Sequence, residues 1–316
     1  MKDSSVETSA LVGYTSVSST DARVLDLLND SFAENSWRAL RSDIARFIHW
    51  GGSVPAQSNE IAKYLAEHSS THAVTTLRRW ISSISHVHAV QDLPNPCRAK
   101  IVDLVLRGIR RRYKRPLRQA SAISEHVIEA IGRAPAKTNR DRRDKAIVLL
   151  GYAGGFRRSE LCAIDCTSVI WTEHGASIWL ESGKTDQRGL GRVIQISSDP
   201  GHSCPVQALR SWFDELPNAS GPVFRPIRKN DRILTDRLSG QSMNVIIKAA
   251  LRRAGQVNST SSHGLRAGFI TNSARAGLSL WQIRQITGHS SDAMVQRYIR
   301  PENLQSTANS VRESAS

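Results

Sequence analysis

Two imidazoles, one guanidinium and one phenol lie within 36 residues near the C-terminus, at His263, Arg266, His289 and Tyr298. A guanidinium donates paired hydrogen bonds to phosphate oxygens, and a phenol is a nucleophile once its proton is removed. A free phenol has a pKa of about 10, so it needs a cationic pocket or a neighbouring base such as an imidazole. These residue types therefore suit attack of a tyrosine on a phosphodiester.

The spacing of the four side chains sets conditions on the structure that holds them. His263 and Arg266 are three residues apart, so on a helix they project from one face. His289 and Tyr298 would be about 13.5 Å apart along one unbroken helix, too far to share a phosphate. Ser290 and Ser291 between them are good N-cap residues. We therefore expect a loop after His289 and a final helix that holds Tyr298.

Two further motifs contribute charged side chains upstream. Arg157 follows a helix that ends in glycine, and Glu160 lies one helical turn further on. Lys184 lies at the tip of a predicted hairpin, with Arg188 and Arg192 close by in sequence. Taken alone, an Arg-x-x-Glu pair is most often a weak surface ion pair, and a single histidine or tyrosine is most often structural. Only the combination indicates a site.

Composition identifies the class of partner. The chain has 316 residues, a net charge of +15 and a pI near 10.3, which makes a polyanion the expected partner. It contains no apolar run of roughly 18 residues that would span a membrane, and no apolar signal-peptide core. We therefore expect an intracellular protein whose natural partner is nucleic acid. The four cysteines suggest reduced core thiols rather than a disulfide framework. The sequence has no acidic cluster suited to Mg²⁺, and we expect no metal or other cofactor.

The first half of the chain reads as helical. We predict a disordered tail over 1–20 and a helical domain over 21–113, with no strand signal. Its helices are expected from Ser36 as N-cap to Gly51, from Ser58, over 71–88 and over 98–113. A linker over 114–122 follows. Basic residues without an acidic one run through the end of the domain and the linker, and we expect them to contact phosphates: Arg107, Arg110, Arg111, Arg112, Lys114, Arg115 and Arg118.

A second domain is predicted over 123–305, followed by a polar tail over 306–316. Helical patterns cover 124–131, 140–152, 157–164, a segment opened by Pro205, 242–253, 263–276 and 279–287, and a last helix carries Tyr298. Three short strands are expected at 168–171, 177–180 and 192–196. The predicted fold class is mainly α with one small antiparallel sheet.

The motifs also occur in a particular order. Gly-Phe-Arg-Arg-Ser-Glu-Leu, a lysine hairpin, His-Gly-Leu-Arg, Gly-His and a tyrosine nine residues later follow one another along the chain. In this order, and over about residues 30–300, the chain resembles the tyrosine recombinase (phage integrase) family. The resemblance implies a Cre-like layout, with a helical core-type DNA-binding domain followed by an α+β catalytic domain.

The resemblance assigns a role to each motif residue. Arg157, Arg266 and His289 would hold the scissile phosphate and stabilise the charge that develops on it. Tyr298 would be the nucleophile and His263 the candidate base that accepts its proton.

Two residues would support this group. Lys184 would protonate the leaving 5′ oxygen, and Glu160 would orient Arg157 or His263 from behind. The product would be a 3′-phosphotyrosyl link, formed without metal or ATP. The resemblance also implies a cytoplasmic protein that binds double-stranded DNA and acts as a homotetramer on paired sites.

Three other functions stay open at this stage. A relaxing enzyme of the type IB topoisomerase kind would use the same chemistry as a monomer. A non-catalytic DNA-binding protein would keep the fold without cleavage. A metal-dependent nuclease is the least expected, and persistence of cleavage in EDTA would separate it from the other functions.

Overall fold

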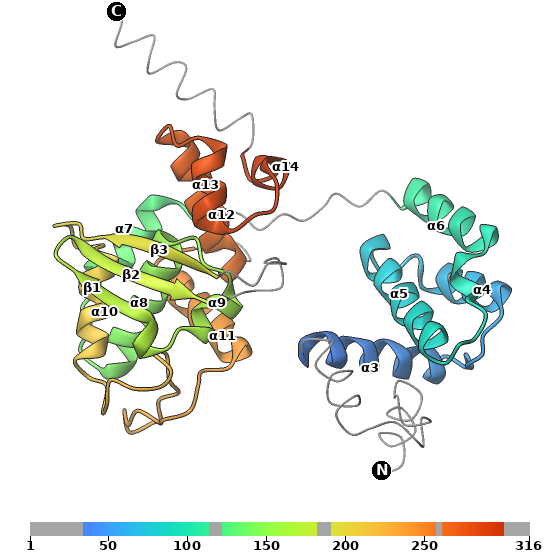
Figure 1. Ribbon diagram of the computed structural model, residues 1–316, viewed down its shortest axis with the longest axis horizontal. Coiled ribbons are helices and arrows are strands. Elements are labelled where there is room, and N and C mark those ends of the chain that lie inside the picture. The colour runs from blue at the N-terminus through green and yellow to red at the C-terminus, as the bar shows by residue number, and fades with distance from the viewer. Residues whose placement is uncertain (1–33, 114–121, 182–190, 257–260, 300–316) are drawn as a thin grey trace, which may run out of the picture. The chain divides into compact units, whose positions relative to one another are not determined.

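The chain divides into two compact units, Met1–Leu117 and Arg118–Ser316. The computed structural model describes residues 34–113, 122–181, 191–256 and 261–299 (Figure 1). Mainly helical units with one small antiparallel sheet confirm the predicted fold class. The predicted tails, and all but the last residue of the predicted linker, lie outside the described residues, so the finer domain boundaries stay predictions.

The first unit is all-helical over its described residues. Its elements are α3 (Glu34–His49), α4 (Ser58–His68), α5 (Val74–Val90), a 3-10 turn (Pro96–Arg98) and α6 (Lys100–Arg112). Ile44, Leu65 and Leu77 are completely buried and join α3, α4 and α5 in one core. The expectation that Ser36 caps the first helix is wrong, because the helix begins at Glu34.

The second unit contains eight α-helices and one 3-10 turn among its described residues. In chain order these are α7 (Glu125–Arg133), α8 (Asn139–Ala153), α9 (Arg158–Ala163), a 3-10 turn (Cys166–Ser168), α10 (Pro205–Phe213), α11 (Gly240–Arg253), α12 (Ser262–Arg275), α13 (Leu280–Thr287) and α14 (Asp292–Gln296), with a β-sheet between the 3-10 turn and α10. Helix α8 is central: residues 146–150 are buried on every side, and α8 packs against α7, α10, α11 and α12.

The sheet has the order β1-β2-β3 and is antiparallel throughout. Its strands are β1 (Val169–Thr172), β2 (Gly175–Leu180) and β3 (Arg192–Ser197). Alternate residues point to the core, so Ile178, Ile194 and Ile196 are buried while Trp179 and Val193 face outward. Arg192 is the first residue of β3 and pairs in register with Leu180.

The last three helices carry the C-terminal motif residues and form a small core of their own. Figure 1 shows α12, α13 and α14 grouped at one end of the unit. Ile270, Ile283 and Val295, one from each helix, are fully buried together, and Tyr298 packs against them.

The prediction that Tyr298 lies on the last helix is wrong. Helix α14 ends at Gln296, and Tyr298 lies in the turn that follows. The turn is fixed from both sides, because the amide N–H of Tyr298 donates to the Val295 carbonyl at 3.0 Å and its own carbonyl accepts from Thr271 Oγ1 at 3.2 Å.

The four cysteines are free thiols, as expected; Cys162, Cys166 and Cys204 are buried and Cys97 is half-buried. Within the described ranges, no helix has the length and apolar character needed to cross a bilayer.

Candidate active site

Arg157 reaches the site from the start of α9. It is the N-cap residue of that helix, and Gly155 before it has a left-handed φ of +55° that turns the chain after α8. Its Nη1 donates to Glu160 Oε1 at 2.6 Å, its backbone N–H donates to Glu160 Oε2 at 2.6 Å, and its Nη2 donates to the Gly288 carbonyl at 2.7 Å. The Arg157 side chain keeps 28% of its surface exposed, so its guanidinium is fixed in orientation yet accessible.

Arg266 is almost fully buried, at 2% exposure, and is held by carbonyl oxygens from two other segments. Its Nη1 donates to the Gly155 carbonyl at 2.7 Å and its Nη2 donates to the Thr287 carbonyl at 2.5 Å. These acceptors come from the α8–α9 turn and the end of α13. The guanidinium therefore joins three parts of the chain and has one possible plane.

His289 follows directly on the end of α13. Gly288, the C-cap, has a φ of +64°, a left-handed conformation that glycine adopts without steric cost. The turn directs the His289 ring back to Arg266, whose Nη2 lies 3.1 Å from Nε2 and 3.2 Å from Nδ1. Thr287 Oγ1 lies 2.8 Å from His289 Nδ1 and 2.6 Å from the Ile283 carbonyl.

These contacts indicate which ring nitrogen of His289 carries the proton. Because a carbonyl only accepts, the Thr287 hydroxyl donates to Ile283 and leaves its oxygen to accept from Nδ1–H of the imidazole. Arg266 only donates, so Nε2 accepts from it. The neutral tautomer with the proton on Nδ1 satisfies the hydrogen bonds to Thr287 and Arg266, and the 3.2 Å approach of Arg266 Nη2 to Nδ1 is then a contact without a hydrogen bond. Sequence reasoning missed Thr287, whose signal is its place immediately before the Gly-His motif.

Tyr298 and His263 meet although they come from different helical segments. The phenol oxygen lies 3.0 Å from His263 Nε2, within hydrogen-bond distance. The Tyr298 ring also lies 5.7 Å from the His289 ring, centroid to centroid. The predicted base, His263, therefore lies within reach of the phenol. His263 is exposed and Tyr298 half-buried, so a large substrate can approach the pair.

Burial and the two arginines of the site lower the pKa values of its histidines. Burial, and then repulsion from Arg266 and Arg157, lowers the pKa of His289 to about 3. The surrounding protein and the same two arginines lower the pKa of His263 below its usual value. Burial lowers the pKa of Arg266 to about 10, still far above neutrality. At neutral pH both imidazoles are therefore neutral and both guanidinium groups are charged, which suits a base beside an anion-binding pocket.

Glu160 supplies the single carboxylate of this cluster among the residues that the structure describes. Burial alone would raise its pKa, but the charges of Arg192 and Arg157 and the hydrogen bonds from Arg157 outweigh burial and hold the pKa below normal. Of the two partners foreseen for Glu160, the structure places Arg157 against it. Its second partner is Arg192, at 2.9 Å, a residue to which the sequence assigned no role in this cluster.

The remaining predicted residues are distributed differently. Lys184, Lys114, Arg115 and Arg118 lie outside the described residues, so their places stay predictions. The other basic residues, at 107 and 110–112, lie on α6 with exposed side chains. Arg107 forms an exposed ion pair with Asp103 at 2.9 Å. The three arginines in the last turn of α6 form no ion pair with the described residues, so their charges stay available for a phosphate.

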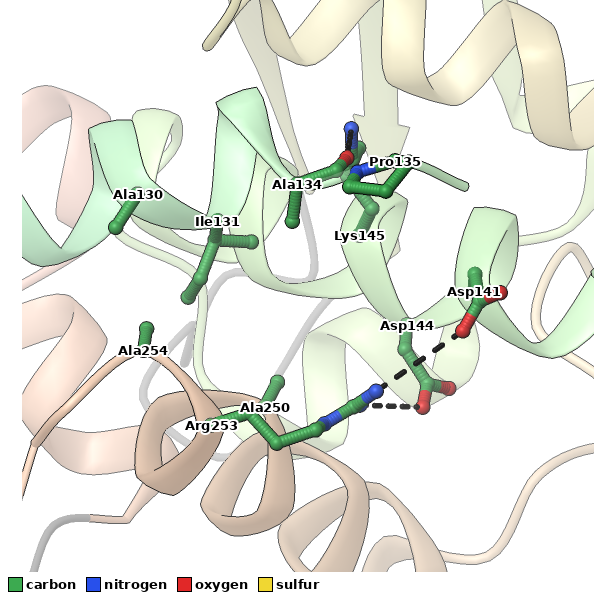
Figure 2. Close-up of a pocket in the computed structure, with 10 residues that line it drawn as sticks. All are labelled: Ala130, Ile131, Ala134, Pro135, Asp141, Asp144, Lys145, Ala250, Arg253 and Ala254. Carbon is green, nitrogen blue, oxygen red and sulfur yellow. Dashed lines mark hydrogen bonds and ion pairs between the residues drawn. The ribbon is translucent and has the colours of Figure 1, made fainter. Parts of the chain in front are cut away.

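A pocket of about 300 Å³ opens elsewhere in the second unit, between α7, α8 and α11 (Figure 2). It contains none of the predicted site residues. Its charged side chains already have partners within the protein: Arg253 pairs with Asp144 at 3.4 Å, and Lys145 donates to the Gly132 carbonyl at 2.9 Å. Across the four described ranges, no group of three His, Cys, Asp or Glu side chains is arranged to hold a metal ion.

Comparison with known proteins connects this geometry to one family. Residues 121–304 match the sequence profile of the phage integrase family. An integrase/recombinase XerD homolog of Selenomonas ruminantium is 31% identical over 88% of this chain and 84% of its own length. The recombinase Cre of Escherichia phage P1 is 24% identical over 88% of each chain.

A solved structure shows the same fold. The lambda integrase tetramer bound to a Holliday junction superposes with a TM-score of 0.58 at 13% identity, over 92% of this chain and 76% of that one. The matched stretch of the family profile contains Arg157, Glu160 and the whole C-terminal motif group.

Proposed function

We propose that this chain, which belongs to the phage integrase family, exchanges DNA strands between specific sites through a covalent link from Tyr298 to a 3′ phosphate. Members of this family of tyrosine recombinases cleave and rejoin DNA. The observation that carries the finer proposal is the 3.0 Å contact between the phenol of Tyr298 and Nε2 of His263, beside Arg157 and Arg266.

In the proposed cleavage step, His263 accepts the phenol proton as the Tyr298 oxygen attacks phosphorus. The bond from phosphorus to the 5′ oxygen breaks, and that oxygen takes a proton from Lys184. Attack adds a second negative charge to the phosphate, and the fixed guanidinium groups of Arg157 and Arg266 stabilise that charge where it develops. Rejoining reverses each transfer with a 5′ hydroxyl from another strand.

We infer that the reaction requires neither metal nor ATP. The phosphotyrosyl link conserves the energy of the broken bond, so ligation needs no external source. The positive charge that a metal would otherwise supply comes from arginines that are charged at every physiological pH.

We also propose that the active assembly is a tetramer on two paired duplexes, and that it acts in the cytoplasm, where its DNA substrate is. The net charge of +15 supports DNA as the partner, and the lambda integrase tetramer on a Holliday junction supports four protomers.

The test uses a nicked DNA substrate that carries a candidate site, so that cleavage releases a short strand and traps the protein. Wild type is expected to give a denaturation-resistant protein–DNA complex in the presence of EDTA and without ATP. Tyr298→Phe is expected to bind the same DNA and form no complex. A complex with the phenylalanine variant would refute the assignment of the nucleophile. Relaxation of plasmids that lack the site would instead favour a topoisomerase.

A further inference from the structure

We propose that Arg192 is a positioning residue for strand cleavage: it holds the carboxylate of Glu160 and thereby sets the orientation and free charge of Arg157. The inference rests on the proposed function, because it concerns the same phosphate-binding arginine. It adds a residue from β3 to a site otherwise built from the α8–α9 turn and the C-terminal helices.

The first observation is that two guanidinium groups share one carboxylate oxygen. Glu160 Oε1 lies 2.6 Å from Arg157 Nη1 and 2.9 Å from Arg192 Nη2. The other oxygen, Oε2, accepts from the backbone N–H of Arg157. A carboxylate that faced Arg157 alone would form a two-bond fork with it and occupy the donors that a phosphate needs. Here Oε2 is held by the Arg157 backbone N–H, so no such fork forms, and Arg192 shares Oε1 with Arg157 and competes for its charge.

The second observation is a close contact on the far side of Arg157. A Cβ atom added to Gly288 would lie 2.2 Å from Arg192 Nη1, so the Arg192 guanidinium packs directly against the glycine backbone. The carbonyl of that glycine accepts from Arg157 Nη2 at 2.7 Å. Arg192 therefore lies against both groups that hold the Arg157 guanidinium, the Glu160 carboxylate and the Gly288 peptide.

The third observation concerns the hydrogen bonding of Arg192 itself. Its Nε and Nη2 atoms are inaccessible to solvent, and neither makes a hydrogen bond with the described residues. Nη2 forms an ion pair with Glu160 without the alignment of a hydrogen bond. Burying guanidinium donors in this way is unfavourable unless their charge is compensated. Glu160 provides the compensation, and in return Arg192 is the strongest of the charges that keep the pKa of Glu160 low.

The net charge of this cluster is positive. Among the described residues, Arg157, Arg192 and Arg266 carry three positive charges against the single carboxylate of Glu160. Removing Arg192 leaves Glu160 to pair with Arg157 alone, which lowers the positive charge available to a phosphate and frees the carboxylate to turn.

The experiment measures the single-turnover rate of covalent complex formation on the nicked substrate for Arg192→Gln, Arg192→Lys, Glu160→Gln and the double variant R192Q/E160Q. R192Q is expected to cleave about 10- to 100-fold more slowly than wild type, the usual effect of losing an outer partner of a site residue. R192K, which keeps the charge, is expected to recover part of the rate. If Arg192 acts through Glu160, the double variant will be no slower than E160Q, because coupled residues are not additive.

A matched control removes the same charge elsewhere in the unit. Arg237 pairs with Asp165 at 2.7 Å and donates to the Cys162 carbonyl at 2.8 Å. Arg237→Gln is expected to bind DNA as R192Q does and to cleave at the wild-type rate. Thermal unfolding of all variants identifies loss of structure, and if R192Q unfolds, the same comparison with E160Q is made on R192K.

Three results would overturn the proposal. R192Q could cleave as fast as wild type, or the rate loss of the double variant could equal the product of the two single losses. The third result would be rescue of R192Q by a substrate with sulfur in place of the 5′ bridging oxygen. A thiolate leaves without a general acid, so rescue would mean that Arg192 serves leaving-group protonation instead. No covalent complex from wild type would refute the proposed function itself, which is a distinct outcome.

Discussion

The phenol oxygen of Tyr298 lies 3.0 Å from Nε2 of His263, although 35 positions separate the two residues in the sequence. The contact exists because Val295 of α14 is buried together with Ile270 of α12 and Ile283 of α13. An ion pair between Arg284 and Asp292 at 3.2 Å holds α13 to α14. The proposed nucleophile and its proposed base therefore already lie within hydrogen-bond distance of each other in one chain.

This contact predicts the pH dependence of cleavage. The pKa of His263 lies below its usual value because of the protein around it, Arg266 and Arg157, so the base is already neutral at pH 7. The single-turnover rate is expected to stay constant down to about pH 6.5, the ordinary imidazole pKa, and to fall only below it. His263→Gln is expected to lower the rate about 10²- to 10⁴-fold and to abolish this acid limb. An unchanged limb in the variant would exclude His263 as the base.

The buried guanidinium of Arg266 makes a conservative substitution informative. Lysine keeps the charge but cannot donate to the Gly155 and Thr287 carbonyls and a phosphate in one plane. Arg266→Lys is therefore expected to bind site DNA nearly as well as wild type, because phosphate affinity follows charge, while cleavage falls about 10²- to 10³-fold. Filter binding and single-turnover cleavage on the same substrate separate the two effects. Equal losses in both would contradict the argument.

Thr287 is predicted to act through the tautomer of His289. Thr287→Val removes the hydroxyl that accepts from Nδ1–H while keeping the side-chain volume. We expect cleavage about 10- to 100-fold slower than wild type, as for other partners that orient a site histidine. The matched control is Thr287→Ser, which keeps the hydroxyl and loses only a buried methyl group. If the serine variant were as slow as the valine variant, packing rather than the hydrogen bond would be responsible.

The low pKa of His289, about 3, predicts acid sensitivity of the fold. In the unfolded chain the imidazole has its ordinary pKa of about 6.5, so below that value the unfolded state binds more protons than the folded state. The contribution of His289 to stability is therefore complete above about pH 6.5 and is lost progressively toward pH 3. From pH 7 to pH 4.5 wild type is expected to lose about 2–3 kcal/mol more than His289→Gln, a scale set by 1.36 kcal/mol per pKa unit. Urea unfolding at the two pH values measures it, and equal losses would contradict the prediction.

Gly288 is predicted to tolerate no side chain. Alanine there would bear the strain of a φ of +64° and would also displace Arg192. Gly277 offers a matched control, since it has a φ of +88° with nothing within 4 Å of an added Cβ. Both alanine variants are expected to lose about 1 kcal/mol from backbone strain, and Gly288→Ala is expected to lose more and to cleave more slowly. Comparable stability and cleavage rates in the two variants would show that the Arg192 contact has no consequence.

The sequence by itself determined the elements of the second unit and the composition of its site. Hydrophobic periodicity, glycine stops and serine caps are local signals, and they placed α8 over 140–152 where the structure has 139–153, and β3 over 192–196 where it has 192–197. The residue types also indicated the chemistry, because a phenol near imidazoles and guanidinium groups suits attack on a phosphate.

Only the tertiary structure decided how these side chains are coupled. Arg192 reaches Glu160, and Thr287 reaches the His289 ring that lies against Arg266, because β3, α9, α12 and α13 converge around Gly155 and Gly288, two glycines with positive φ. Sequence patterns report which face of an element is buried, and they do not report which buried faces meet. The turn that carries Tyr298 illustrates the same limit: its position depends on the packing of Val295 between two other helices rather than on the helical pattern of its own segment.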